Sequence, residues 1–350
     1  MQQNPSVAVV ILSWNGKTFL EQFLPVLLQT TYSNAKFVVA DNCSTDGTSV
    51  FVKENFPTVH VIDIGENEGF AKGYNIALKQ VEADVYVLLN QDVEVTPNWL
   101  EPVAEMFAAN ENLAAVQPKI KAFHNKEAFE YAGAAGGYID WLGYPFCRGR
   151  IFDTTEKDEG QYNSNTEIFW ASGACFFVRA NVYHKLGGLD ADFFAHMEEI
   201  DLCWRIKNAG YNIQHCYQST VYHVGGGSLP YGNSRKTYLN YRNNLLMMIK
   251  NYYSSYFWLI LLLRFILDGI SGVKLFFSGK FKDVEAILKA HGHFYLNLNS
   301  HLDKRKKLLS AFRHKSSSNF VKGIYFKSIV WQYFFKKKRT FAELNKEDFS

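Results

Sequence analysis

The sequence predicts an α/β protein with a mainly parallel sheet covered by helices on both faces. Three observations lead to this fold class. Apolar runs rich in β-branched residues alternate with helical patterns along the first part of the chain. The runs lack the polar alternation of a half-exposed strand, which indicates burial on both faces. Each run ends in a polar cluster before the next helical pattern begins.

Four strands are expected, each with a polar carboxyl end. The first run, residues 7–15, ends in the polar turn of residues 13–16 before a helical pattern. The second is followed by Asp41, Asn42 and Asp46, and the third and fourth are the segments VHVIDIG and DVYVLLN. Because ligands bind outside the carboxyl ends of the strands in such sheets, these clusters predict a ligand site.

The familiar phosphate-binding loops of α/β proteins do not occur in the sequence. A dinucleotide-binding turn needs G-x-G-x-x-G after the first strand, where this chain has Ser-Trp-Asn-Gly-Lys. No G-x-x-x-x-G-K-S/T loop is found either. A bound diphosphate would therefore be held most simply through a divalent cation.

Asp92 lies where the fourth strand should end, directly after Asn90 and Gln91. A cation that bridges two phosphates needs one or two protein carboxylates and takes its other ligands from phosphate and water. A carboxylate at a strand end can supply such a ligand. The segment also fits turn chemistry, with Thr96 as the N-cap and Pro97 as the first residue of a helix.

Glu198, Glu199 and Asp201 crowd the start of an amphipathic helix that is expected from Glu198 onward. Carboxylates in a first helical turn interact favourably with the helix dipole, which is one explanation of the cluster. The cluster also follows an aromatic, apolar stretch, and burial beside like charges raises the pKa of a carboxyl into the range of a general base. Both explanations stay open at this point.

His223 ends a strand-like run and precedes the glycines of residues 225–227. A histidine in this place can ligate a metal, and a glycine backbone can approach an anion closely. A single histidine in a strand is more often structural, so the functional interpretation depends on the glycines beside it.

Seven segments in order resemble the family 2 glycosyltransferases, which are inverting enzymes of the GT-A fold, and in particular their rhamnosyltransferase-like bacterial members. These segments are VVILSWNG, VVADNCSTDGT, ENEGFAKGYNIAL, LLNQDVEV, ASGACFFVRANVYHKLGGLDADFFAHMEEIDLCWRIKNAGY, VYHVGGGS and YLNYRNNLLMMIKNY. They lie within residues 7–252. The resemblance implies the GT-A fold, followed by a C-terminal helical extension.

The resemblance also implies a role for each matching residue. The pocket for the base and ribose of a nucleotide sugar would be formed by Ser13, Trp14, Asn15, Asp41, Asn42 and Asp46. The donor pocket near the diphosphate would be lined by Asn67, Gly69, Gly73 and Asn75. Mg²⁺ or Mn²⁺ would bind Asp92 next to Asn90 and Gln91, with His223 as a further metal or phosphate ligand. The general base would be Glu199. The floor of the acceptor site would be formed by Trp170, Ser172 and Gly173.

Two positions depart from the family pattern. The D-x-D element reads Asn90-Gln91-Asp92, so only its last carboxylate is present. The base position, an Asp after a Glu in most members, is Glu199 after Glu198. A glutamate can still take a proton from a hydroxyl, but Glu198 or Asp201 could hold the role instead.

The implied activity is a metal-dependent, inverting transfer of a hexose in cell-surface polysaccharide synthesis. The donor would be a dTDP- or UDP-sugar, and the acceptor a saccharide or a lipid-linked oligosaccharide. Residues 1–250 would form the catalytic domain, with a donor half at 1–95 and an acceptor half at 96–250. The two departures support an alternative, a catalytically weak scaffold that binds nucleotide sugars in a polysaccharide assembly complex.

The last part of the chain, residues 251–350, is expected to be basic, aromatic and helical. Residues 250–350 hold 19 Lys/Arg against 7 Asp/Glu, whereas the rest of the chain holds 18 against 27. The apolar stretch at residues 256–267 contains Arg264 and is shorter than the roughly 20 residues of a membrane span. An amphipathic helix at an anionic membrane surface is therefore expected, supported by basic runs at 304–307 and 336–339. Packing on the catalytic core or on a second copy is the alternative, and no nucleic-acid-binding module accompanies the charge.

The five cysteines form no C-x-x-C pair, and no signal peptide precedes the first strand-like run. We therefore expect reduced and mostly buried thiols in a cytoplasmic protein, peripheral on the inner face of the cell membrane.

Overall fold

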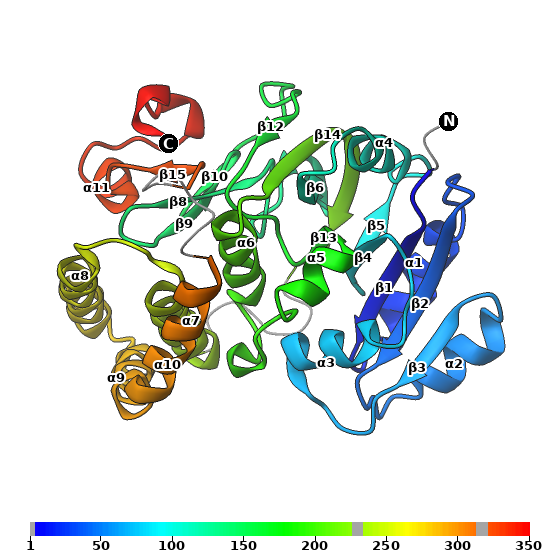
Figure 1. The fold of residues 1–350 in the computed structure, drawn as a ribbon, viewed down its shortest axis with the longest axis horizontal. Coiled ribbons are helices and arrows are strands. Elements are labelled where there is room, and N and C mark those ends of the chain that lie inside the picture. Colours follow the sequence, from blue (N-terminus) through cyan, green and yellow to red (C-terminus); the bar gives the residue numbers. More distant parts are fainter. Residues whose placement is uncertain (1–3, 226–233, 313–320) are drawn as a thin grey trace.

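The computed structural model describes residues 4–225, 234–312 and 321–350, and within these ranges the fold is built on two sheets (Figure 1). The central sheet has the strand order β12-β14-β6-β13-β4-β1-β2-β3, with β5 paired to β14 and β7 to β6. The smaller sheet has the order β11-β10-β9-β8-β15. Helices cover both faces of the central sheet, as the sequence predicts.

The four predicted strands and the helices between them are confirmed. They are β1 (Val7–Ser13), α1 (Lys17–Leu27), β2 (Ala35–Asp41), α2 (Thr48–Asn55), β3 (His60–Asp63), α3 (Gly69–Leu78) and β4 (Val85–Asn90). The strands pair in parallel, with Ser13 opposite Asp41 and Leu12 opposite Asn90. This register brings the polar residues at the strand ends to one edge of the sheet.

The second half of the central sheet is mixed rather than parallel. β13 (Cys175–Arg179) lies antiparallel to both β4 and β6 (Leu113–Ala122), and β14 (Asn212–His223) is parallel to β6. The prediction of a mainly parallel sheet therefore describes the first half best. The minor strands are β5 (Val93–Val95), β7 (Asn125–Phe129) and β12 (Thr166–Glu167).

The helix expected to start at Thr96 and Pro97 begins later, which corrects the prediction. α4 spans Glu101–Ala109 with Leu100 at the N-cap position. The chain stays extended through β5 because this strand pairs with the end of β14, and Thr96 donates from Oγ1 to the carbonyl of Thr220. Tertiary pairing outweighs the local capping preference here.

α6 (Glu198–Asn208) starts where the sequence predicts, but it is not amphipathic. Every residue of this fully described helix is buried except Glu199. It packs against β14 and against α7 (Ser234–Asn251), so both sides of the helix are covered. Arg205 pairs with the buried Asp201 of the same helix, and the buried Lys207 pairs with Glu167.

The chain beyond residue 250 folds back onto the rest of the molecule. β15 (Ile324–Tyr325) adds in parallel to β8 (Gly137–Asp140) in the smaller sheet. The rings of Phe341 and Phe349 lie 4.9 and 5.3 Å from that of Tyr138, between ring centroids. The expected division at residue 250 is therefore not a break between separate hydrophobic cores. The other elements of this sheet and of its surroundings are β9 (Pro145–Cys147), β10 (Arg150–Ile151), β11 (Thr154–Thr155) and α11 (Ile329–Phe334).

Three helices form an outer layer against α7 on the side away from β1–β3 (Figure 1). They are α8 (Phe257–Phe277), α9 (Phe281–Leu296) and α10 (Leu298–Phe312). The predicted helix at residues 256–267 thus runs ten residues further. None of the helices in the described ranges is long and apolar enough to cross a membrane. Residues 313–319, whose sequence RHKSSSN predicts a loop, lie outside the described residues.

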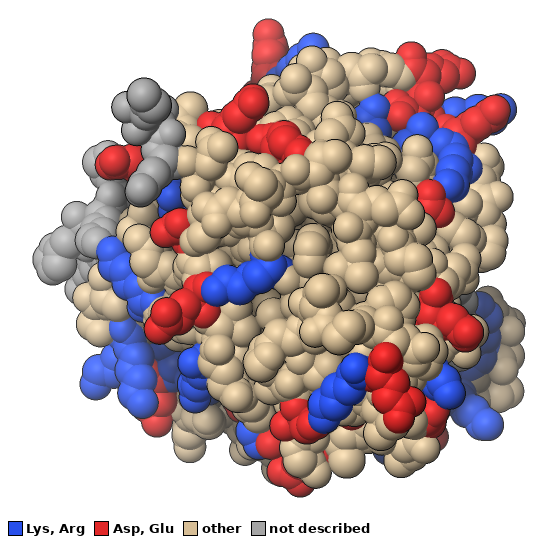
Figure 2. Space-filling view, turned by 90° about the vertical axis from the view of Figure 1, so that its right-hand side faces the viewer, with Lys and Arg blue, Asp and Glu red and all other residues tan. Residues whose placement is uncertain are grey.

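The outer face of the amino-terminal half carries acidic and basic side chains side by side around a largely uncharged centre, not a patch of one sign (Figure 2). All five cysteines lie in described residues and none forms a disulfide; Cys43 is exposed and the other four are buried. The expectation of buried, unpaired thiols is confirmed for these four.

Candidate active site

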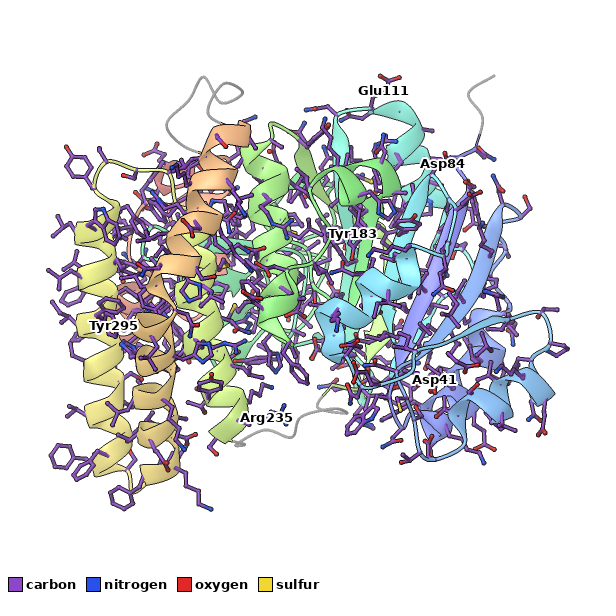
Figure 3. The ribbon with its side chains drawn as sticks, turned by 60° about the horizontal axis from the view of Figure 1, so that its bottom comes forward. Asp41, Asp84, Glu111, Tyr183, Arg235 and Tyr295 are labelled. Atoms are coloured by element: carbon purple, nitrogen blue, oxygen red, sulfur yellow. The ribbon has the colours of Figure 1, made fainter. Side chains whose placement is uncertain are left out.

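Two halves of the molecule meet at the carboxyl edge of β1, β2 and β4. Asp41, at the end of β2, and Arg235, in the first turn of α7, both lie at this edge, whereas Asp84, before β4, lies at the opposite one (Figure 3). The predicted site residues must be placed relative to this edge.

Pairing between β5 and β14 brings Asp92 to His223. Val93 lies opposite His223 in the ladder, and Val224 donates its backbone N–H to the carbonyl of Asp92. The Oδ1 atom of Asp92 lies 3.2 Å from Nε2 of His223. Asn90 Nδ2 lies 3.4 Å from the same nitrogen. Two segments separated by more than a hundred residues thus form one polar cluster, as the sequence predicts.

Glu130 is the other neighbour of His223. Its Oε2 atom lies 3.4 Å from Nδ1 of the imidazole, an ion-pair distance, and its side chain is buried. Burial lowers the pKa of His223, but the contacts with Asp92 and Glu130 outweigh it and raise the pKa to about 10. Burial raises the pKa of Asp92, and His223 more than offsets it, so this pKa is lowered. The imidazole is therefore a cation at neutral pH between two carboxylates.

Glu199 is the one residue of α6 with partial access to solvent. A Cβ atom at Gly173 would lie 3.8 Å from its carboxyl carbon and 3.4 Å from the ring of Phe70, so both side chains border Gly173. Burial raises its pKa to about 7, although backbone N–H groups, including that of Gly173, act in the opposite direction. Its Oε2 atom is enclosed and accepts no hydrogen bond from a described residue.

Glu198 and Asp201 are both more deeply buried than Glu199. Glu198 is 4% exposed, and burial, with the charge of Glu199, raises its pKa well above the ordinary value. Asp201 is fully buried and accepts hydrogen bonds from Arg205 (2.9 Å) and Asn251 (2.7 Å). It also pairs with Lys250 at 2.8 Å. Asp201 therefore joins α6 to α7 and has no free oxygen to offer a substrate.

The cluster around His223 and the carboxylate of Glu199 lie close together. Asn90, which lies 3.4 Å from His223, donates its backbone N–H to the carbonyl of Ala174 at 3.0 Å, and Ala174 follows Gly173, which borders Glu199. The segment after Glu130 also lies directly under the loop beside Glu199: a Cβ at Gly133 would meet that of Ser172 at 2.5 Å. Asp92, His223, Glu130 and Glu199 thus surround one region of the molecule.

The segment that carries Glu199 has an unusual backbone. Phe194, His196 and Met197 all have positive φ angles, of 61°, 70° and 71°. Such angles cost energy for residues other than glycine and persist where the surroundings hold them. Asn243 of α7 supplies part of that support, because its Nδ2 donates to the carbonyls of Phe193 (3.0 Å), Ala195 (2.8 Å) and His196 (2.7 Å).

Arg242, the residue before Asn243, completes this support. Its guanidinium donates to the carbonyls of Asp192 (2.7 Å) and Phe193 (2.9 Å). The side chain of Asn243 accepts a further hydrogen bond from Arg242. We call these two residues the α7 clamp, since together they fix the backbone that leads into Glu199.

The turn after β1 is tied to the turn after β4. Ser13 donates from Oγ to Gln91 Oε1 at 2.8 Å, and the backbone N–H of Trp14 donates to the same oxygen at 3.2 Å. A Cβ at Gly16 would lie 2.0 Å from this oxygen, so only glycine leaves room for Gln91. The indole of Trp14 is 45% exposed, which leaves an aromatic surface open beside this turn.

The turn after β2 packs on the turn after β1. Asn15 accepts the backbone N–H of Thr45 (2.8 Å) at Oδ1, and Asp46 accepts that of Lys17 (3.0 Å). Asp41 accepts the N–H of Ser44 with Oδ2, while its Oδ1 atom is enclosed and has no partner among the described residues. The structure therefore brings Ser13, Asn15, Asp41 and Asp46 together.

Asn42 joins the start of α3 to this group. Its Nδ2 donates to Asn67 Oδ1 at 3.1 Å and to the carbonyl of Gly69 at 3.3 Å. Gly69 has a φ of +72°, and a Cβ there would lie 2.6 Å from the ring of Phe194. Gly69 thus allows close contact between α3 and the segment before Glu199.

Comparison with known proteins identifies the family. The sequence model of glycosyl transferase family 2 matches residues 8–187. The chain belongs to this family. The N-acetylglucosaminyl-diphospho-decaprenol L-rhamnosyltransferase of Mycobacterium tuberculosis is 27% identical over 58% of this chain and 71% of its own length. The dTDP-rhamnosyl transferase RfbF of Shigella flexneri is 23% identical over 71% of this chain and 82% of its own.

Solved structures support the fold. The glycosyltransferase is similar to GalNAc-T7, solved with UDP, GalNAc and Mn²⁺, with a TM-score of 0.57 and 17% identity. The match covers 73% of this chain and 49% of that one. The GT-A fold expected from the sequence is thereby confirmed.

Three residues that the resemblance assigns to pockets have structural roles in this glycosyltransferase. Asn75 is saturated: it donates to the carbonyl of Leu189 and accepts from Tyr183, both at 2.7 Å. Trp170 is 2% exposed and donates to the carbonyl of Tyr138. Gly73 faces Leu12, since a Cβ there would lie 2.9 Å from that side chain. The contacts of Asn75 and Gly73 hold α3 in place, and that of Trp170 holds the smaller sheet.

Ser172 and Gly173 are neighbours in one loop, but only Gly173 contacts Glu199. Ser172 is buried, and its backbone N–H donates to Gln117 at 2.9 Å. Gly173 reaches the Glu199 side chain, as described above. Of the expected acceptor floor, only Gly173 therefore borders the candidate base directly.

Glu130 and the α7 clamp were missed by the sequence analysis. Glu130 lies in the segment FEYAGAAGG, which carries no motif and is unremarkable apart from its glycines. Arg242 and Asn243 belong to the segment YLNYRNNLL, which matched the family without an assigned role. A polar Arg-Asn-Asn run inside an otherwise apolar helix was the available signal, because buried polar groups need partners.

A surface hollow of about 610 Å³ lies elsewhere, between β2, β3 and the residues before β4. It is lined by Lys36, His60 and Glu82, among others, and by none of the expected site residues. It faces the amino ends of the strands and plays no part in the site.

Proposed function

We propose that this glycosyltransferase moves a sugar from a nucleotide diphosphate donor to an acceptor hydroxyl in a single displacement with inversion. The observation that carries the proposal is the position of Glu199. It is the one accessible residue of a buried helix, its pKa is raised to about 7, and it lies close to the Asp92–His223 cluster. A base with a pKa near the working pH and a neighbouring site for diphosphate are what this reaction needs.

Glu199 acts as the general base in this proposal. Its carboxylate takes the proton of the acceptor hydroxyl while the oxygen attacks the anomeric carbon. The bond between that carbon and the diphosphate breaks on the opposite face, and the nucleotide diphosphate leaves. Glu198, which is more deeply buried than Glu199 and whose pKa burial raises well above the ordinary value, and Asp201, which is paired with Lys250 and Arg205, are less suited to the role.

The donor nucleotide would lie across the turns after β1 and β2. Asp41 offers an enclosed carboxylate oxygen, without a partner in the described residues, to ribose or base hydrogen-bond donors. The exposed indole of Trp14 offers a stacking surface. Asn67 and Gly69 would border the diphosphate, because Asn42 ties both to the turn after β2, where the nucleotide is proposed to lie.

A divalent cation fits this site through Asp92. Within the described ranges no group of three His, Cys, Asp or Glu side chains forms a protein cage for a metal. Mg²⁺ and related ions bound to nucleotides do not need one, since one or two carboxylates suffice together with phosphate oxygens and water. A bound ion would neutralise the charge that develops on the leaving diphosphate. The structure of GalNAc-T7 was solved with Mn²⁺.

We assign the cation to Asp92 and the contact with a phosphate oxygen to His223. The two side chains lie 3.2 Å apart in one cluster, and an imidazole N–H can donate to a phosphate oxygen. The sequence had left both roles open for His223.

The acceptor is proposed to be a saccharide on a lipid carrier, and the donor a dTDP- or UDP-sugar. The names of the relatives from Mycobacterium tuberculosis and Shigella flexneri supply this proposal, one naming a diphospho-decaprenol acceptor and the other a dTDP-sugar. The enzyme would then work in cell-surface polysaccharide synthesis, at the cytoplasmic face of the membrane.

A panel of nucleotide sugars tests the proposal. The purified chain is titrated with each sugar, with and without Mn²⁺, and its melting temperature and the release of nucleotide diphosphate are recorded. One donor should stabilise the protein only with the metal and should be turned over. The alternative, a scaffold that binds nucleotide sugars, predicts stabilisation without hydrolysis or transfer to any acceptor, and that result would overturn the enzymatic proposal.

A further inference from the structure

In α8, unlike in an ordinary surface helix, two charged side chains are buried and many apolar side chains are exposed. Its charged residues Arg264 and Asp268 face inward, 4% and 1% exposed, and form an ion pair at 2.9 Å. Arg264 also lies over the ring of Tyr144 at 3.7 Å, and His291 of α9 approaches Asp268. These polar contacts fasten the helix to the body of the molecule.

The outward side of α8 is apolar instead. A row of side chains that are each more than half exposed follows the helical spacing of three and four residues: Leu259, Leu262, Ile266, Ile270, Val273 and Phe277. We call this row the α8 stripe. Its first and last residues, Leu259 and Phe277, are eighteen positions apart, which corresponds to about 27 Å along a helix axis. An exposed apolar surface of this extent on a folded protein marks an interaction site.

Aromatic and basic residues continue the stripe at its carboxyl end. Lys274 lies 5.0 Å from the ring centroid of Phe334 in α11, so the two helices adjoin there. Trp331 of α11 and Phe335, the residue after this helix, stack at 4.3 Å and are 51% and 64% exposed. The basic run of residues 336–339 follows at once in the chain. A long apolar row with exposed aromatic rings and lysines at one end is typical of helices that lie in the headgroup layer of a bilayer.

We propose that the α8 stripe, with the end of α11, docks the enzyme onto an anionic lipid surface. The stripe would lie among the acyl chains near the headgroups, and Lys274 and residues 336–339 would contact the anionic headgroups. Arg264 and Asp268 keep the helix attached to the protein, so it lies on the membrane and does not cross it. The inference rests on the proposed function at one point: a lipid-linked acceptor would explain why the enzyme needs a membrane-binding surface.

Charge favours a lipid surface over a second copy of the chain. An isologous dimer formed through the same stripe would bring two copies of the basic run to one interface, where like charges repel. An anionic surface complements them. Position agrees with this assignment: α8 lies at the outer edge of the molecule (Figure 1), and Tyr295 of the adjoining α9 lies in the helical layer opposite Asp41 (Figure 3).

Flotation of the full chain with lipid vesicles tests the inference. Vesicles of phosphatidylcholine are compared with vesicles that also contain phosphatidylglycerol, in the absence of donor. The wild type should bind the anionic vesicles and should be released by salt. The double variant Ile266→Glu/Ile270→Glu should bind at least about tenfold more weakly, because two charges would enter the apolar layer.

Val50→Glu is the matched control, since Val50 is 58% exposed on α2, away from α8. It should float like the wild type, and all variants should keep the wild-type melting temperature and rate on the donor panel. Equal binding of the wild type and the stripe variant would overturn the inference. So would a wild-type dimer in light scattering that the stripe variant converts to a monomer. The donor panel uses no lipid, so its failure would overturn the proposed reaction and leave the flotation result standing.

Discussion

With Glu199 as the proposed general base, the rate of transfer should depend on pH. A general base must be ionised, and burial holds the pKa of this carboxyl at about 7 in the free enzyme. The value of kcat/KM should therefore rise about tenfold per pH unit below this pKa and level off above it. The pH profile measured with a saturating metal concentration checks this. A profile that is flat from pH 5 to about 8 would exclude a base with this pKa.

The same shift makes a prediction about stability. The pKa of Glu199 is raised from 4.5 to about 7 by folding, so its contribution to stability is complete below pH 4.5 and is lost as the pH rises through 7. Glu199→Gln removes the ionisation and should melt higher than the wild type at pH 8, by on the order of 2 °C or more, but not at pH 4. Melting curves at both pH values test this, and an equal difference at both would contradict it.

At the scale of single elements, the α7 clamp links a buried helix to the base. Asn243 makes three hydrogen bonds to the strained segment before Glu199, so Asn243→Ala should let that segment relax. A base displaced by about 1 Å can cost on the order of a hundredfold in rate. We expect kcat to fall roughly ten- to a hundredfold while the KM for donor changes little.

Asn244→Ala provides the comparison for this variant. Asn244 is the next residue of α7, is equally buried, and donates to the carbonyl of Gly143 instead. Both variants should be destabilised by about 1–3 kcal/mol, as expected for the loss of a buried hydrogen bond. A fall in kcat of the same size in both would show that Asn243 acts only through general stability.

Secondary structure in the first half of the chain could be predicted, because the strands are mostly apolar runs and a helical pattern follows each of them. The later errors have tertiary causes. Thr96 and Pro97 look like a helix start, but pairing with β14 keeps the chain extended. Asn75 and Trp170 match family positions, yet their partners, Leu189 and Tyr138, are remote in sequence. Such contacts cannot be predicted from the residues that are neighbours in sequence.

At the scale of the whole molecule, the C-terminal residues belong to the same core as the catalytic half. Phe341 and Phe349 pack on Tyr138 and β15 completes the smaller sheet. A chain ending at residue 250 would expose these surfaces, so it should aggregate or melt at least about 10 °C below the full chain, since several large buried side chains are removed. Thermal denaturation with light scattering checks this. A truncated chain with the wild-type melting temperature would show an independent domain.

The assembly of the site was predictable only in part. Asp92, Glu199 and His223 were selected by residue type and by place in the predicted strands and helices, and the structure brings them to one region. Glu130 and the α7 clamp were not selected, because their function arises from contacts across the sheet and between helices.

The central claim is that Glu199 removes the acceptor proton next to a donor held independently at Asp92 and His223. The most direct measurement is the transfer rate of Glu199→Gln together with its affinity for the donor in the presence of metal. The account predicts a loss of transfer of roughly 10²–10⁴-fold with donor affinity unchanged. Turnover close to that of the wild type would contradict it.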